Sequence, residues 1–537
     1  MHRCLAVNEL LSLIFENLFL DRGSEDEELL EDVVAEEALA NLAITCRSFT
    51  EPALNHLWRV QRVFANLVRC MPHDLWVQHG PRAVLTFRRA LCQTDWDRFD
   101  FYARRIRQIG APNLLEISDV TMVEVGEDVF IALATYQPIR VLLPNLLALY
   151  CMPWSWAALP YIQAFIGHQL TTFDLGVEAF FDEGRGRSDL SPNYLVSLFS
   201  ALSHHSPMIT SLSIGLNGLN RDVEEAFLTC VGSLKHLRDA DIFIPDMEGE
   251  EELMACLANA PLLESLCADV TSASCHLYTT VHNRFQNLRI LVAEFEGLQL
   301  VGRTLGAMQC QFDELRIRPS VPETTTNWQL PQLGQSLLVF RNHPCRLTLT
   351  VLELCPVELP TRDPEDDSKM SDILRPLFDL VNLQHVEIVM DQTVDLGDSW
   401  LTDASKAWPS LSHLTLASSS PSKPNLTLAA VGSLIQNCPD LRSFSLRVDA
   451  TSNAGYPDDY GLCNYWITDI YIMGPIDCPE EVSRVLQRML PNLERTISWD
   501  EGDSRSSLEE LDKFENSWKK VDEILCAQYS GPPVQVP

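Results

Sequence analysis

The chain has 537 residues, of which 46% are hydrophobic and 21% are charged. This composition fits a globular protein and excludes a collagen-like, coiled-coil or wholly disordered chain. The formal net charge is −34 at pH 7, and phosphate contacts need clustered lysine and arginine, so we expect no nucleic-acid partner and no attraction to an acidic membrane.

Sixteen cysteines are scattered along the chain without a C-x-x-C pair, which predicts reduced, mostly buried thiols. The N-terminal sequence has no secretion signal, so we expect a cytosolic or nuclear protein. The stretch 141–173 contains no Asp, Glu, Lys or Arg and is long enough to cross a bilayer. Pro144, Pro153 and Pro160 interrupt it, so we expect a buried core segment instead.

The predicted elements begin with three short helical segments. From Glu9 onward, apolar residues gather on one side of a helix, and Asn8 is a good N-cap. A second helix is predicted over 39–49, and Pro52 stands where a third begins. Such a small cluster needs the rest of the chain or a partner to cover it. Its apolar positions are Leu10, Leu11, Leu13, Ile14 and Leu18, then Leu39, Leu42, Ile44, Cys46 and Phe49, then Leu54, Leu57 and Trp58.

The segment 21–37 between the first two helices is acidic. Residues 24–37, SEDEELLEDVVAEE, hold eight carboxylates in fourteen positions. Carboxylates this dense repel one another, which predicts a solvated loop or short helix. The alternating ligands and glycine of an EF-hand are missing, so we expect no calcium site there.

The phrases LAVNELLSLIF and ALANLAITCRSFTEPALNHLW resemble the F-box, a three-helix module that docks substrate receptors on the Skp-type adaptor of cullin ubiquitin ligases. These two sequences are similar to those of the large F-box families of mushroom-forming fungi. Two departures are Asn8, where the family usually has proline, and the acidic insert. The alternative is a plain N-terminal helical cap that ends in a buried tryptophan. The resemblance implies an adaptor-binding set of Leu5, Asn8, Leu10, Leu11, Ile14, Leu18, Leu42, Cys46 and Trp58.

A phrase of the form L-x-x-L-x-L recurs between residues 112 and 498, and most successive copies begin 24 to 39 residues apart. This spacing is typical of a leucine-rich repeat in which each unit carries a helix. One unit cannot bury its leucines alone, so stacked units would place parallel strands inside and helices outside. The copies lie at 112–118, 144–151, 169–175, 208–214, 236–242, 262–268, 287–293, 311–317, 382–388, 410–416, 440–446 and 492–498.

We therefore predict an α/β fold, a helical F-box followed by an irregular leucine-rich-repeat solenoid. An ordinary α/β fold would also alternate helix and strand, but it would not repeat one phrase a dozen times. Turn-forming residues predict loops at 359–372, 418–425 and 449–461. The predicted parts are the F-box-like module over 1–60 with its insert at 21–37, a helical linker over 61–110, the solenoid over 111–499, and a capping helix with a tail over 500–537.

The side chains that flank the second leucine of each copy point away from the core, because strand side chains alternate between faces. These positions are acidic in the first half of the repeats and mixed, partly basic, in the second. We expect a partner protein with a basic segment to lie against Asp174 to Glu294. The alternative is that these positions are only solvated. The candidate partner-binding residues are Asp174, Asp239, Asp241, Asp269, Glu294, Arg316 and Arg318.

Motifs for catalysis are missing: the chain has no G-x-S-x-G, G-x-x-x-x-G-K-[ST], G-x-G-x-x-G or H-E-x-x-H. His204 and His205 are adjacent, so on a helix they point about 100° apart and cannot hold one metal. We expect no catalytic activity, no cofactor and no metal. The resemblance implies a substrate-recognition adaptor of a cullin-type ubiquitin ligase that binds a target protein. The alternatives are a repeat scaffold without a ligase role, or an enzyme whose site is assembled only in space.

Overall fold

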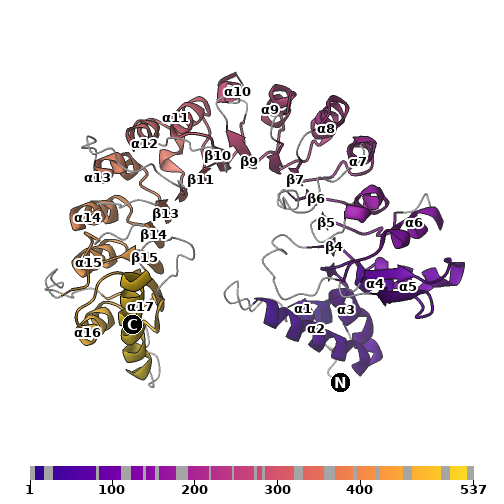
Figure 1. Ribbon diagram of the computed structural model, residues 1–537, viewed down its shortest axis with the longest axis horizontal. Coiled ribbons are helices and arrows are strands. Elements are labelled where there is room, and N and C mark those ends of the chain that lie inside the picture. The colour runs from indigo at the N-terminus through magenta and orange to yellow at the C-terminus, as the bar shows by residue number, and fades with distance from the viewer. Residues whose placement is uncertain are drawn as a thin grey trace. The chain divides into compact units, whose positions relative to one another are not determined.

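The computed structural model divides the chain into two compact units, Met1–Leu262 and Leu263–Pro537. Each unit has its own stack of parallel strands and helices (Figure 1). The residues that the structure describes are 7–16, 28–79, 84–110, 123–136, 141–151, 156–176, 192–216, 219–244, 247–270, 275–280, 285–319, 330–355, 369–390, 396–418, 424–451, 463–497 and 508–528.

The first unit begins with a helical module of α1 (Asn8–Glu16), α2 (Glu28–Thr45) and α3 (Arg47–Leu57). Strands β2 (Trp76–His79) and β3 (Val84–Phe87) form a separate antiparallel pair. The parallel strands, each paired with the next, are β1 (Val60–Gln61), β4 (Gln108–Ile109), β5 (Ala148–Tyr150), β6 (Thr172–Leu175), β7 (Ser211–Gly215) and β8 (Asp239–Phe243). The further helices are α4 (Ala65–Arg69), α5 (Trp96–Ala103), α6 (Glu127–Tyr136), α7 (Pro192–His205), α8 (Arg221–Ser233) and α9 (Glu250–Ala258).

The second unit repeats one strand-and-helix pattern. Its parallel strands, again each paired with the next, are β9 (Ser265–Val270), β10 (Ile290–Phe295), β11 (Glu314–Pro319), β12 (Val351–Leu354), β13 (His385–Met390), β14 (His413–Ser418), β15 (Ser443–Arg447), β16 (Asp469–Met473) and β17 (Arg495–Ile497). Its helices are α10 (Cys275–Thr280), α11 (Leu298–Ala307), α12 (Leu330–Leu337), α13 (Met370–Ile373), α14 (Asp398–Ala407), α15 (Leu428–Asn437), α16 (Pro479–Met489) and α17 (Leu508–Gln528).

Rows of apolar side chains in register form the core of each unit. In the second unit, neighbouring strands place Leu266, Leu291, Leu315, Leu352 and Val386 side by side, each at most 1% exposed. These residues occupy the second apolar position of the L-x-x-L-x-L phrase. The phrase therefore marks the face of each strand that the helices cover.

The predicted α/β solenoid is confirmed, with parallel strands in chain order and helices along one side of each sheet (Figure 1). Two strands of the second unit were not predicted. Leu349 to Leu354 fits the phrase and forms β12, and Ile467 to Ile472 fits it with isoleucine and forms β16. The copy predicted at 112–118 lies outside the described residues.

The segment 61–110 differs from the helical linker that we expected. It contains α4 and α5, but also β2, β3 and β4, and β4 pairs with β1 on one side and β5 on the other. The parallel sheet therefore begins with β1, at the start of this segment, and continues with β4 at its end. The second half of the acidic insert, from Glu28, belongs to α2. The predicted loops at 359–372, 418–425 and 449–461 lie largely outside the described residues.

The uncharged stretch 141–173 contributes several residues to the core, as expected: Leu143, Leu149 and Phe165 are fully buried, whereas Leu147 is 38% exposed. Among the described helices, none is both long and apolar enough to span a membrane. At the other end of the chain, α17 packs against β16 and β17. The Trp518 indole is buried and donates a 3.0 Å hydrogen bond to the Gly474 carbonyl oxygen.

Candidate protein-binding surfaces

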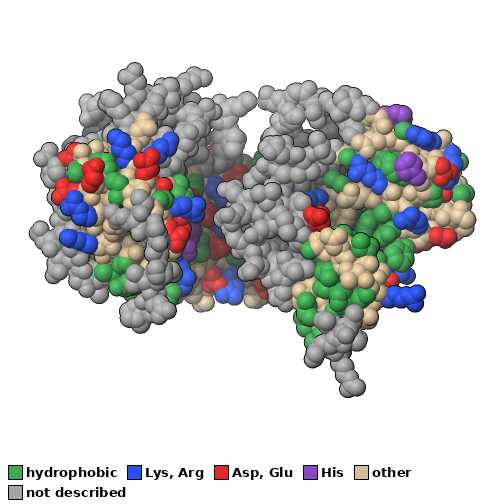
Figure 2. Space-filling model, turned by 90° about the horizontal axis from the view of Figure 1, so that it is seen from below, with side chains coloured by type: hydrophobic (Ala, Val, Ile, Leu, Met, Phe, Trp, Pro, Cys, Tyr) green, Lys and Arg blue, Asp and Glu red, His purple; other side chains and the backbone are tan. Residues whose placement is uncertain are grey.

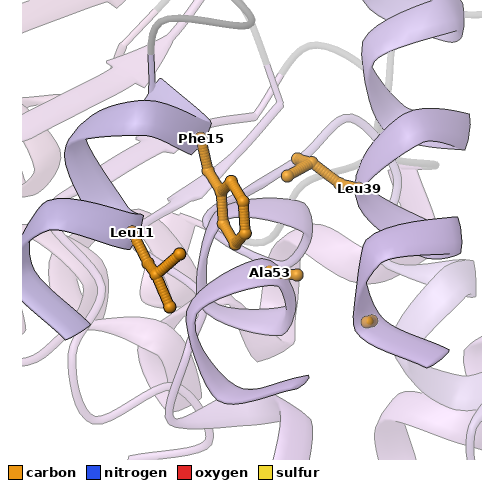
Figure 3. Packing of buried hydrophobic residues seen from close by; sticks show 5 residues of the cluster. Leu11, Phe15, Leu39 and Ala53 are labelled. Atoms are coloured by element: carbon orange, nitrogen blue, oxygen red, sulfur yellow. The ribbon is translucent and has the colours of Figure 1, made fainter. Parts of the chain in front are cut away.

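A small apolar core holds the three N-terminal helices together. Leu11 and Phe15 of α1 are buried with Leu39 and Ala43 of α2 and Ala53 of α3. Leu11 and Phe15 are four residues apart, so they lie on the same side of α1, and Figure 3 shows both extending toward the other two helices. This core fixes which side of α1 faces the protein.

A second apolar strip of α1 is exposed. Leu10 and Ile14 are 42% and 47% exposed, and Val7 and Leu13 are 41% and 56% exposed. Residues advance by about 100° along a helix, so these four lie together beside the buried strip. Ile44 of α2 is also exposed, and hydrophobic side chains gather over the N-terminal helices in Figure 2. We call Val7, Leu10, Leu13 and Ile14 the exposed α1 strip.

The structure separates the predicted adaptor-binding residues into core and surface. Leu10, Ile14 and Asn8 are exposed, whereas Leu11 is buried. Leu42 is half-buried against the small core. The other described residues of the set are also half-buried: Cys46, which precedes α3, and Trp58, whose ring packs against Tyr102 at a tilt of 34° with 4.3 Å between centroids. Leu5 and Leu18 lie outside the described residues.

The open face of the first unit is acidic. Asp174, Ser213 and Asp241 lie in register on β6, β7 and β8. Asp239 and Asp241 are exposed, and Asp174 is half-buried. Burial, with a smaller contribution from the charge of Asp241, raises the pKa of Asp174 to about 6 despite its hydrogen bond from the Gly176 amide. A cation placed here would relieve that repulsion.

On the open face of the second unit, positive and negative charges are more evenly matched than the sequence suggested. Asp269 lies in register with Glu294, and Glu294 with Arg318. Arg316 and Arg318 both pair with Glu353 of β12, at 3.1 Å and 3.4 Å. The two arginines predicted as a basic part of this face are therefore paired with carboxylates, Arg316 with Glu314 and Glu353, and Arg318 with Glu353. Sequence analysis missed Glu353 because it did not recognise β12.

One cluster on this face has the donor types of a metal site. Ligand atoms of Glu353, His385 and Glu387 lie within 4.8 Å of one another. However, Glu353 has one carboxylate oxygen on Arg316 and the other on Arg318. A divalent cation would have to displace both guanidinium groups, so the cluster fits an ion-pair network better than a metal centre.

The described cysteines form no disulfide, and burial raises the pKa of the Cys230, Cys310, Cys345 and Cys438 thiols to about 12. Such thiols stay protonated and unreactive. His343 lies close to Cys345 but accepts from its backbone amide at 3.2 Å. That contact orients a buried histidine and activates no nucleophile.

Comparison with known proteins gives little further information. No family model matches the chain, and no curated protein matches it. A chain in the yeast complex of Rad7 and Elc1 is similar at 13% identity and a TM-score of 0.33, over 66% of this chain and 82% of that one. A chain in the complex of TLR13 with ssRNA13 is similar at 10% identity and a TM-score of 0.31, over 79% of this chain and 60% of that one. At these TM-scores neither likeness assigns a role to this chain.

Proposed function

We propose that the chain is a substrate-recognition adaptor of a cullin-type ubiquitin ligase. Helices α1 to α3 would dock on a Skp-type adaptor, and the repeat units would bind a target protein. The observation that carries the proposal is the exposed α1 strip, which lies within the sequence that resembles the F-box. A helix that is apolar on two sides needs cover on both, and the described part of the chain covers only one.

The strip is large enough to matter for binding. Full burial of one such side chain is worth about 1.5–3 kcal/mol. Each of the four side chains is already about half buried, so the strip offers about 3–6 kcal/mol in total. A micromolar complex corresponds to about 8 kcal/mol. The strip would therefore supply a large part of the binding free energy, with the rest from its surroundings.

The chain would contribute proximity, and other subunits would supply the transfer chemistry. A target held on the repeat units would have a raised effective concentration near the loaded conjugating enzyme. We propose no catalytic residue and no cofactor, because the sequence has no catalytic motif and the buried thiols are held protonated. We also propose no nucleic-acid or membrane partner and a cytosolic or nuclear location.

The acidic face of the first unit suggests the chemistry of the target. Asp174, Asp239 and Asp241 would bind a segment with lysine or arginine side chains. Since the pKa of Asp174 is raised to about 6, this carboxylate is fully charged only above that pH. Capture of a basic segment should therefore strengthen between pH 5 and pH 8.

A repeat scaffold without a ligase role is the second candidate. Asn8 favours it, because the F-box family usually has proline at this position and the change could weaken docking on the adaptor. The two candidates differ in one measurable property, which is binding to the Skp-type adaptor.

The test is co-purification of the full-length chain with a Skp-type adaptor from a mushroom-forming fungus. In the test variant, Leu10→Lys and Ile14→Lys place two charges on the exposed α1 strip. The matched control is Leu338→Lys with Leu347→Lys, two exposed apolar residues of the second unit. We expect the wild type and the control to retain the adaptor and the test variant to lose it, with unchanged thermal unfolding.

Two results would contradict the proposal. If the folded wild-type chain captures no Skp-type adaptor, the result favours a repeat scaffold without a ligase role. If the test variant and the control retain the adaptor equally, the exposed α1 strip is not the docking surface.

A further inference from the structure

A groove in the first unit gathers positive charge in a strongly acidic chain. It has a volume of about 460 Å³ and lies where α3 meets the N-terminal ends of β1, β4 and β5. This volume equals about fifteen water molecules, so it admits several side chains. Its lining includes Arg59, Arg104, Arg105, Arg107 and Asn145.

Parallel pairing brings these arginines together. Arg59 comes directly before β1, and Arg107 directly before β4. The Arg107 amide donates to the Arg59 carbonyl oxygen at 2.8 Å, so the two residues lie at the same level of neighbouring strands. Among the described residues that line the groove, four are arginines and Glu51 is the one carboxylate. The lining therefore carries a net charge of +3 in a chain whose net charge is −34.

Glu51 already forms an ion pair with one of the four arginines. Arg105 is only 5% exposed and pairs with Glu51 at 2.6 Å. The Nε of Arg105 is buried and has no hydrogen-bond partner among the described residues. A buried donor without a partner costs roughly 1–3 kcal/mol. Arg105 is therefore held in the wall of the groove by Glu51, and its Nε is not accessible to a ligand.

The other three arginines keep their charge available. Arg59 is half-exposed and lies 3.4 Å from Glu16, which is also half-exposed, so this pair is weak. Arg107 donates to the Asn145 carbonyl oxygen, which is uncharged. Arg104 is exposed, with its guanidinium 5.2 Å from the centre of the Phe101 ring. No carboxylate among the described lining residues balances them.

We propose that this groove binds a run of aspartate and glutamate side chains on a protein partner. Guanidinium groups form paired hydrogen bonds with carboxylates, and the groove has room for more than one. The negative charge of the rest of the chain is screened beyond about 8–10 Å at physiological salt, so the local charge decides binding. This inference does not depend on a ligase role, and it concerns a different surface from the acidic face.

The experiment measures fluorescence anisotropy of a labelled eight-residue peptide rich in Asp and Glu, titrated with the full-length chain. A second peptide has Asn and Gln at the acidic positions. The groove variant combines Arg59→Gln, Arg104→Gln and Arg107→Gln and leaves Arg105 in place. The matched control combines Arg88→Gln, Arg98→Gln and Arg221→Gln, which removes the same charge from exposed arginines elsewhere in the unit.

We expect the acidic peptide to bind and the neutral peptide not to bind. The groove variant should weaken binding about tenfold or more, the control less than threefold, and binding should weaken as salt rises. If the groove variant does not fold, Arg104→Gln alone should weaken binding about threefold, because this exposed side chain has no ion pair with any residue that the structure describes. Equal binding by groove variant and control would overturn the proposal. Binding of inorganic phosphate alone, with no peptide binding, would also overturn it.

Discussion

Helix α1 carries two strips of the same chemistry with opposite roles, and one substitution in each separates them. Leu11 is fully buried, so Leu11→Ala removes a packed side chain and leaves a cavity, at about 3 kcal/mol. Leu10 is 42% exposed, and alanine is at least as good a helix former as leucine. Leu10→Ala should therefore cost less than about 1 kcal/mol.

The assay is hydrogen exchange of the α1 to α3 amides in the full-length chain, because a small module can open locally without global unfolding. A loss of about 3 kcal/mol makes exchange about 100-fold faster, whereas Leu10→Ala should change it less than about fivefold. Binding of a Skp-type adaptor should show Leu10→Ala weakened while its exchange stays protected. Equal loss of protection in both variants would refute the assignment of one strip to the core and the other to the surface.

Three further predictions concern the repeat units. Asp174→Asn should leave thermal stability unchanged at pH 4 and raise it by about 1–3 kcal/mol at pH 8. Burial raises the pKa of Asp174 to about 6 in the folded chain, so the wild type loses stability as this carboxylate ionises. A difference that does not depend on pH would contradict this. Gly474→Ala should destabilise the second unit by about 2–3 kcal/mol, because this glycine has φ +136° and an added Cβ would overlap the Val448 carbonyl oxygen; an unchanged melting temperature would contradict it. Glu353→Ala removes the carboxylate that Arg318 and Arg316 share, while Arg316 keeps its second pairing, with Glu314. We therefore expect a loss on the order of 1 kcal/mol in urea unfolding. A gain in stability would show that the ion pairs of Glu353 do not offset its desolvation.

The sequence by itself determined the repeat architecture. Each unit must cover its leucines with the next, so a recurrent apolar phrase predicts stacked parallel strands whatever the details. The same reasoning predicted helices at the N-terminus, because their apolar residues recur at helical spacing. It misplaced their bounds, since α2 ends at Thr45 and Pro52 lies inside α3 and not at its start. Even the unpredicted strands β12 and β16 fit the phrase once isoleucine is allowed beside leucine.

Only the tertiary structure decided which side of α1 faces the core and how the charges on the strands are paired. Leu10 and Leu11 are neighbours in an apolar run, and their roles separate only when α2 and α3 cover one of them. The pairing of Arg316 with Glu353 and the grouping of Arg59 with Arg107 depend on which strands lie side by side. Spacing along the chain reports local geometry, whereas charge balance is set by register between segments tens of residues apart.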